Sequence, residues 1–184
     1  RETDSVRYVP DNWNGEVATF DFQAWDQVTG TAGQTANPIP NGGTTAFSTN
    51  TESTFLIITS VNDAPVLDSS GAPFYTGTDE NTTSPAETVA TMIARGAGGD
   101  PISDVDTGAS EGIAITGFSG NGTWQYDTGG GFTTLPTVNT DTALLLRDSD
   151  SMQYIPDTAN GETAFLTFVA WDQTSGTVGL TADP

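Results

Sequence analysis

The sequence predicts an all-β protein made of antiparallel β-sandwich modules, and three observations point that way. The chain of 184 residues is rich in turn-forming residues, with 21 Gly and 10 Pro. Short segments of alternating polar and apolar residues recur between turn signals, which is typical of strands with one buried face. Finally, a long stretch of the chain occurs twice, as expected for repeated modules.

The internal repeat shows how the chain is organised. Residues 1–38 align without gaps onto residues 147–184, and 21 of these 38 positions are identical. The repeat distance is therefore 146 residues, from 147 − 1, which is long enough for one hydrophobic core per repeat. The chain opens inside one repeat and runs into the next.

The positions at which the two copies lie in the chain predict the module boundaries. We expect residues 1–61 to be the C-terminal part of one module, 62–65 to be a linker, and 66–184 to be the next module without its last strand. That strand should match part of residues 39–61. A partial sandwich with an open edge is not stable alone. Either the chain belongs to a long tandem array or neighbouring chains complete one another, and the sequence leaves both options open.

Residues 15–26 carry the clearest strand pattern. Phe20 and Phe22 fall on one face, whereas Trp25 falls on the other, and the second copy at residues 161–172 repeats the alternation. The segment 86–94 has some helical character, but its Thr and Val content favours a strand. The expected strands are 8–10, 15–26, 54–61, 86–94, 113–118, 123–126, 132–135, 143–146, 154–156 and 161–172.

Turn residues between these strands predict three hairpins. Asn-Gly dipeptides precede the strands at 15–26 and 161–172, so each of these should pair with the short strand before it. A third hairpin should join 123–126 to 132–135 across the glycine-rich turn between them.

Composition excludes several functions. The chain has no Cys and no His, and its four basic residues are all Arg, so thiol chemistry, disulfides, Cys/His zinc sites and the usual bases for a Ser nucleophile are absent. A net charge of −20 repels nucleic acid, which we exclude as a partner. No apolar run has transmembrane length, so membrane insertion is not expected. Carboxylate chemistry remains, either binding of hard cations or a two-carboxylate glycosidase.

Four motifs then occur in a familiar order. Residues 61–66 read Val-Asn-Asp-Ala-Pro-Val, 102–106 read Ile-Ser-Asp-Val-Asp, and 168–172 read Phe-Val-Ala-Trp-Asp, with a copy of the last at 22–26. A Tyr-x-Pro…Asn-Gly pattern precedes each copy of that last motif. The chain resembles the cadherin-like tandem repeats of giant bacterial surface adhesins over nearly its whole length, through the linker, the Asp-x-Asp motif and the Ala-x-Asp strand end.

The resemblance implies a Greek-key sandwich whose modules join end to end through calcium at the linker. Ser60 replaces the first Asp of the animal linker pattern, and the nearest equivalents of its Asp-Arg-Glu motif are Asp148 and Asp150. One or two calcium ions per junction are therefore expected rather than three. The implied ligands are Asn62, Asp63, Asp104, Asp106 and Asp172, with Glu80 matching a glutamate that in the family serves the opposite end of its own module.

Elementary chemistry agrees with calcium. Ca²⁺ takes about 6–8 oxygen ligands. Four carboxylates held together without a cation would repel one another by several kcal/mol at an effective dielectric of about 20. A bound Ca²⁺ makes the total electrostatic energy of the group favourable. The competing interpretations are a solvated acidic loop for Asp104 and Asp106, a turn-capping role for Asp172, and an exposed turn for Glu80.

The aromatic residues raise one alternative. Trp124 and Trp171 could form a carbohydrate platform, or could pack within the module, as Trp171 would if its face is covered by other parts of the chain. A glycosidase would need two carboxylates across a deep cleft, which nothing in the sequence suggests, so we expect no enzyme.

The sequence thus favours a structural repeat module of a secreted, extracellular bacterial adhesin or surface fibre, rigidified by Ca²⁺ at its linkers. Its partners would be neighbouring repeats of the same chain, or identical subunits assembled head to tail into a filament. The alternative function is a carbohydrate-binding module of a polysaccharide-associated protein, with surface glycans as partners.

Overall fold

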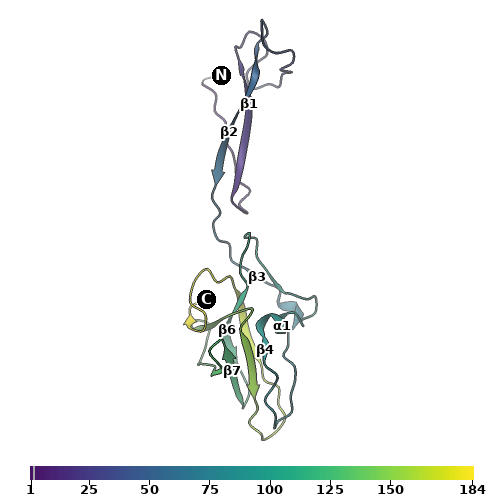
Figure 1. Ribbon diagram of the computed structural model, residues 1–184, viewed down its shortest axis with the longest axis vertical. Helices are drawn as coiled ribbons and strands as arrows, with labels where there is room; N and C mark the ends of the chain where they lie inside the picture. The colour runs from purple at the N-terminus through teal and green to yellow at the C-terminus, as the bar shows by residue number, and fades with distance from the viewer. Residues whose placement is uncertain (2) are drawn as a thin grey trace. The chain divides into compact units, whose positions relative to one another are not determined.

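The computed structural model describes residues 1 and 3–184, and the all-β prediction is confirmed. The sheets are antiparallel, and within the described residues helical structure is confined to α1 (Val89–Ile93) and the 3₁₀ turn η1 (Ser69–Gly71). The chain forms two compact units, Arg1–Val61 and Asn62–Pro184 (Figure 1). The Greek-key connectivity and the cadherin-like nature of the units remain predictions.

The first unit consists of a two-stranded antiparallel sheet and its loops. Strand β1 (Glu16–Trp25) pairs with β2 (Phe47–Ile58), from Glu16 opposite Ile58 to Trp25 opposite Phe47. Ala46 is the one buried hydrophobic residue among the described residues of this unit. The apolar side chains of both strands are largely exposed, so this unit has almost no core.

The second unit contains two four-stranded antiparallel sheets and one small two-stranded sheet. Their strand orders are β4-β10-β7-β8, β11-β6-β9-β12 and β3-β5. The strands are β3 (Val66–Leu67), β4 (Glu87–Thr88), β5 (Ile102–Ser103), β6 (Gly112–Phe118), β7 (Thr123–Asp127), β8 (Thr133–Thr134), β9 (Ala143–Arg147), β10 (Ser151–Ile155), β11 (Leu166–Trp171) and β12 (Thr181–Ala182).

The main core of the second unit is formed by residues from both four-stranded sheets and by helix α1. Strand β9 is buried on both faces, because Leu144 and Leu146 join the main core while Ala143 and Leu145 pack with Trp171 in a second cluster. The fully buried aliphatic side chains set the position of the sheets through dispersion and the hydrophobic effect. The buried members of the main core are Val89, Met92, Ile93, Ile102, Ile113, Ile115, Trp124, Leu135, Leu144, Leu146, Met152 and Tyr154.

The hairpin predictions had mixed outcomes. The β7–β8 pair confirms the third hairpin. The other two are wrong. Strand β10 pairs with β4 and β7, whereas β11 pairs with β6, so the chain crosses from one sheet to the other between them. In the first unit, residues 8–10 form no strand and β1 pairs with the later strand β2.

The strand expected at 86–94 is also mostly wrong. Only Glu87 and Thr88 are extended, and helix α1 begins directly afterwards. The Thr88 hydroxyl accepts the N–H of Thr91 at 3.1 Å, which is an N-cap, and the helix buries Val89, Met92 and Ile93. Burial of these apolar side chains outweighs the weak β propensity of the segment.

Local interactions recur at the repeat distance of 146 residues. Both copies contain the same three contacts. These are an Arg–Asp ion pair, a Tyr–Glu hydrogen bond, and a hydrogen bond from a Trp indole N–H to the carbonyl four residues later. The first and second copies are Arg1–Asp4 and Arg147–Asp150, Tyr8–Glu16 and Tyr154–Glu162, and Trp25–Thr29 and Trp171–Ser175. The repeated sequence therefore forms the same local contacts in two different surroundings.

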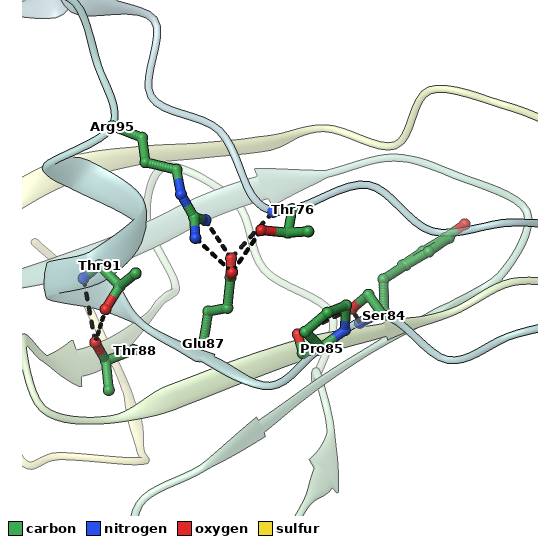
Figure 2. A network of polar contacts seen from close by, with 8 residues as sticks. Thr76, Ser84, Pro85, Glu87, Thr88, Thr91 and Arg95 are labelled. Atoms are coloured by element: carbon green, nitrogen blue, oxygen red, sulfur yellow. Dashed lines mark hydrogen bonds and ion pairs between the residues drawn. The ribbon is translucent and has the colours of Figure 1, made fainter.

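One ion pair fixes the segment that precedes β4. The Arg95 guanidinium donates to both carboxylate oxygens of Glu87, one bond measuring 2.6 Å, and Thr76 donates its N–H and hydroxyl to the same carboxylate at 3.0 and 2.6 Å (Figure 2). The bonds from Arg95 outweigh the effect of burial and, together with those from Thr76, lower the pKa of Glu87 from 4.5 to about 2. Residues around Thr76 are thus tied to β4 and, through Arg95, to the segment that follows α1.

We predict that Glu87→Gln lowers the free energy of unfolding at pH 7 by about 1.5–3 kcal/mol, because the charged hydrogen bonds to Arg95 and Thr76 are weakened. Since the pKa of Glu87 is depressed on folding, the contribution of the carboxylate is complete above its usual pKa of 4.5 and is lost as the pH falls towards 2. Denaturant unfolding of both proteins at several pH values measures the difference.

The control for this experiment is Asp141→Asn, which changes an exposed turn carboxylate. The difference between the native protein and the Glu87→Gln variant should shrink between pH 4.5 and pH 2. A difference that stays constant over this range would contradict the assigned role of Glu87.

Candidate functional site

Three separate segments bring most of the predicted ligands together at one end of the second unit. The β3–β5 pair aligns Val66 with Ser103, which places the residues before β3 beside those after β5. Asp104 and Asp106 follow β5 directly, and Asp172 follows the last residue of β11. Strand pairing, rather than sequence proximity, therefore assembles this acidic group.

Asn62 connects the linker to Asp172. Its side-chain amide donates to Asp172 Oδ2 at 2.7 Å and to the Asp63 carbonyl at 3.1 Å. Asp172 also accepts the N–H and the hydroxyl of Thr174 through its other oxygen, at 2.9 and 2.8 Å. Both oxygens of this carboxylate are thus held in place.

Asp63 and Asp104 both contact Asp106. The N–H of Asp63 donates to Asp106 Oδ2 at 2.7 Å, and the N–H of Asp106 donates to Asp104 Oδ1 at 2.8 Å. The linker therefore contacts the Asp-x-Asp motif through one of its own main-chain groups. We call Asn62, Asp63, Asp104, Asp106 and Asp172 the acidic group.

Asp104 has an unsatisfied oxygen. Its Oδ2 is buried and has no hydrogen-bond partner among the described residues. A buried carboxylate oxygen without a donor is costly, because desolvation is not compensated. A cation or an ordered water bound to this oxygen would therefore compensate its desolvation.

Asp172 is ionised at neutral pH even though only 9% of its surface is exposed. Burial acts to raise the pKa of this carboxyl, but the hydrogen bonds from Asn62 and Thr174 together prevail, so the pKa is lowered overall. The acidic group thus contains a fixed, buried negative charge.

The oxygen atoms of the acidic group are of the types that a hard cation prefers, but they do not surround a single point. Carboxylate, amide and carbonyl oxygens suit Ca²⁺ or Mg²⁺. Within residues 1 and 3–184, no three acidic side chains form a group ready to hold a metal ion. The carboxylates are instead linked by N–H donors, so cation binding would require these side chains to exchange hydrogen bonds for metal contacts.

Glu80 lies apart from the acidic group. It sits in the turn after residues 72–78 and lines a cavity with Asp79 and Glu162. No described hydrogen bond connects it to the acidic group. Asp150, a candidate from the animal motif, is buried and paired with Arg147 at 2.6 Å, which satisfies its charge.

The two tryptophans considered for sugar binding are buried. Trp124 is 6% exposed and packs against Tyr75 and Tyr154, with ring centroids 5.7 and 4.9 Å away, and Trp171 is 7% exposed. A sugar platform needs an exposed ring face, and in this structure both rings are used for packing.

Sequence reasoning missed some of the functional geometry. Thr174 supports Asp172 with two hydrogen bonds, and only the Asp-x-Thr spacing, typical of a turn in which Asp accepts from residue i+2, could have suggested it. The two-residue strands β3 and β5, which align the linker with the Asp-x-Asp motif, are too short to be recognised from alternation.

Comparison with known proteins adds no relatives: no protein-family model, no curated protein and no solved structure matches this chain. Among the described residues, no helix is both long and apolar enough to cross a membrane.

We predict that Asn62→Ala raises the pKa of Asp172 in calcium-free solution, because it removes the side-chain donor while burial of the carboxyl persists. Carboxyl-carbon NMR titration of the native protein and the variant measures this pKa. Asn139→Ala, in a turn elsewhere in the unit, is the matched control and should leave the pKa unchanged. An Asp172 pKa that is the same in all three proteins would show that Asn62 does not support this carboxylate.

Proposed function

We propose that this chain is a structural repeat module of an extracellular bacterial adhesin or surface fibre, and that calcium bound by the acidic group makes the fibre rigid. One observation carries the proposal. Asn62 and Asp63, which directly follow the first unit, are hydrogen-bonded to Asp172 and Asp106, and Asp104 beside them keeps a buried oxygen without a partner.

The residues of this chain would hold the ion as follows. Asp104, Asp106 and Asp172 would supply carboxylate oxygens, and Asn62 would supply its amide oxygen after rotation of the amide. Bound calcium would supply positive charge that compensates the carboxylates and bridges segments far apart in sequence. Because Asn62 follows Val61 directly, fixing it would restrict the chain between the two units.

The fibre part of the proposal rests on the repeat. Ion pairs, Tyr–Glu hydrogen bonds and Trp–carbonyl bonds recur at the same distance of 146 residues as the sequence identities, as expected of successive modules. Calcium sites in extracellular modules typically have dissociation constants of about 10⁻⁴–10⁻³ M, so they fill outside the cell rather than in the cytoplasm. Identical subunits joined head to tail would give the same kind of fibre.

We predict that calcium stabilises the second unit. With a dissociation constant of about 10⁻⁴ M, 10 mM calcium adds about 2.7 kcal/mol, which corresponds to a rise in Tm of about 5–10 °C. Thermal unfolding followed by circular dichroism, with calcium and with excess EGTA, measures the shift.

The variant Asp104→Asn, which removes the charge beside the unpartnered oxygen, should lose most of this stabilisation. Asp141→Asn, on an exposed turn, should keep it. Equal melting temperatures with calcium and with EGTA, or an equal calcium response in all three proteins, would contradict the proposal.

A further inference from the structure

The turn that follows β11 contains a residue in an unusual backbone conformation. Gln173 has a φ of 63°, which lies in the left-handed region that residues with a Cβ atom seldom adopt. Glycine adopts this region without steric cost, and asparagine and aspartate adopt it more readily than glutamine does. A backbone outlier of this kind, next to a residue of the acidic group, points to a function of the side chain that occupies it.

The same conformation recurs in the first copy of the repeat. Gln27, which lies 146 positions before Gln173, has a φ of 69°. In both copies the Asp that precedes this Gln accepts the N–H of the residue that follows it, through one carboxylate oxygen and at 2.9 Å. The two bonds run from Val28 to Asp26 and from Thr174 to Asp172. The turn is therefore a property of the repeated sequence and not of its surroundings.

The Gln173 side chain is anchored to the neighbouring strand. Its amide N–H donates to the Glu111 carbonyl at 2.6 Å. Glu111 directly precedes β6, and the first residue of β6, Gly112, lies opposite Trp171 at the end of β11. The N–H of Asp148, directly after β9, donates to the same carbonyl at 3.2 Å and uses its second lone pair. The anchor is therefore a main-chain atom at the end of three hydrogen-bonded strands, β9, β6 and β11.

This anchor acts one residue away from the Asp172 carboxylate. The turn places the N–H and the hydroxyl of Thr174 on Asp172 Oδ1, at 2.9 and 2.8 Å. The other oxygen, Oδ2, accepts the side-chain amide of Asn62 in the linker at 2.7 Å. Because Gln173 lies between Asp172 and Thr174, fixing its side chain limits the rotation of the main chain that determines these contacts.

We infer that Gln173 is a positioning residue of the proposed cation site, and that it aims the Asp172 carboxylate at the linker. The bond to Glu111 compensates the steric cost of the left-handed backbone, and the turn in return holds Asp172 in one orientation. Residues that orient a metal ligand without touching the ion are a regular part of metal sites, and their loss typically weakens binding by about 10–100-fold. The role towards a cation rests on the proposed function, whereas the positioning of Asp172 does not.

Two substitutions separate the anchor from the backbone conformation. Gln173→Gly removes the bond to Glu111 and also removes the steric cost of a φ of 63°. Gln173→Ala removes the same bond but keeps the steric cost. The matched control is Gln27→Gly, which changes the equivalent turn in the first unit, away from the acidic group.

The first measurement uses the full chain in excess EGTA. Amide hydrogen exchange followed by NMR reports on the Thr174 N–H, which is bonded to Asp172. In Gln173→Gly and Gln173→Ala this N–H should exchange at least about tenfold faster than in the native chain, because the turn is no longer tied to Glu111. Gln27→Gly should leave the exchange of Thr174 unchanged.

The second measurement is calcium binding, followed by isothermal titration calorimetry. Both Gln173 variants should bind calcium about tenfold more weakly than the native chain, and Gln27→Gly should bind within about twofold of it. Thermal unfolding in EGTA should rank the variants differently. Gln173→Gly should melt at a higher temperature than Gln173→Ala, because only alanine keeps the steric cost of the turn. A merely structural role would instead make calcium affinity follow the melting temperature.

Faster exchange of Thr174 and an equal loss of calcium affinity in both Gln173 variants would support the inference. Unchanged exchange of Thr174 in EGTA, calcium binding as tight as in the native chain, or calcium affinity that follows the melting temperature would overturn it. A native chain that binds no calcium would refute the proposed function and the role of Gln173 towards a cation. The exchange of Thr174 in EGTA would still decide whether Gln173 positions Asp172.

Discussion

The edge of one repeated strand is the constraint on which this structure depends. Two copies of the repeated sequence form β1 in the first unit and β11 in the second, and each copy is paired on a different edge. Among the described residues, β1 pairs with β2 and no second sheet covers Phe20 and Phe22, whereas β11 pairs with β6, packs on the core and has no strand along its second edge.

Charge acts against contact between copies of the chain and gives calcium a physical role. A chain with a net charge of −20 repels its own copies, and the buried Asp172 carboxylate adds a charge that is not neutralised at neutral pH. The acidic group holds this charge with N–H donors from Asn62 and Thr174 rather than with basic side chains. A divalent cation would remove the repulsion where the linker enters the second unit. Salt-rich, calcium-containing surroundings outside the cell would then favour both assembly and cation binding.

The sequence predicted the parts of the fold that local patterns encode. Short apolar segments between turn signals identified the strands at 113–118 and 143–146, and the glycine-rich turn identified the β7–β8 hairpin. It failed where tertiary contacts decide. The Asn-Gly dipeptide at 160–161 lies in the connection from β10 to β11 but forms no hairpin, because the two strands belong to different sheets. Helix α1 was missed because burial of Val89, Met92 and Ile93 outweighs the strand propensity of a short segment.

The candidate site was predictable in its membership but not in its geometry. Motif order suggested Asn62, Asp63, Asp104, Asp106 and Asp172, and the β3–β5 pair and the end of β11 place them in one hydrogen-bonded chain. Glu80 is not part of it. The cavity beside β11 could not be foreseen, since it depends on how residues 72–80 are held by Glu87 and Arg95.

Amide hydrogen exchange along β11 tests most directly whether the second edge of this strand is open. In dilute chain, the N–H groups of Leu166, Phe168 and Ala170 should exchange at least about tenfold faster than those of Thr167 and Val169, because only the latter face β6. Equal protection of both sets in dilute chain would show that the edge of β11 is not open, and the account would be wrong.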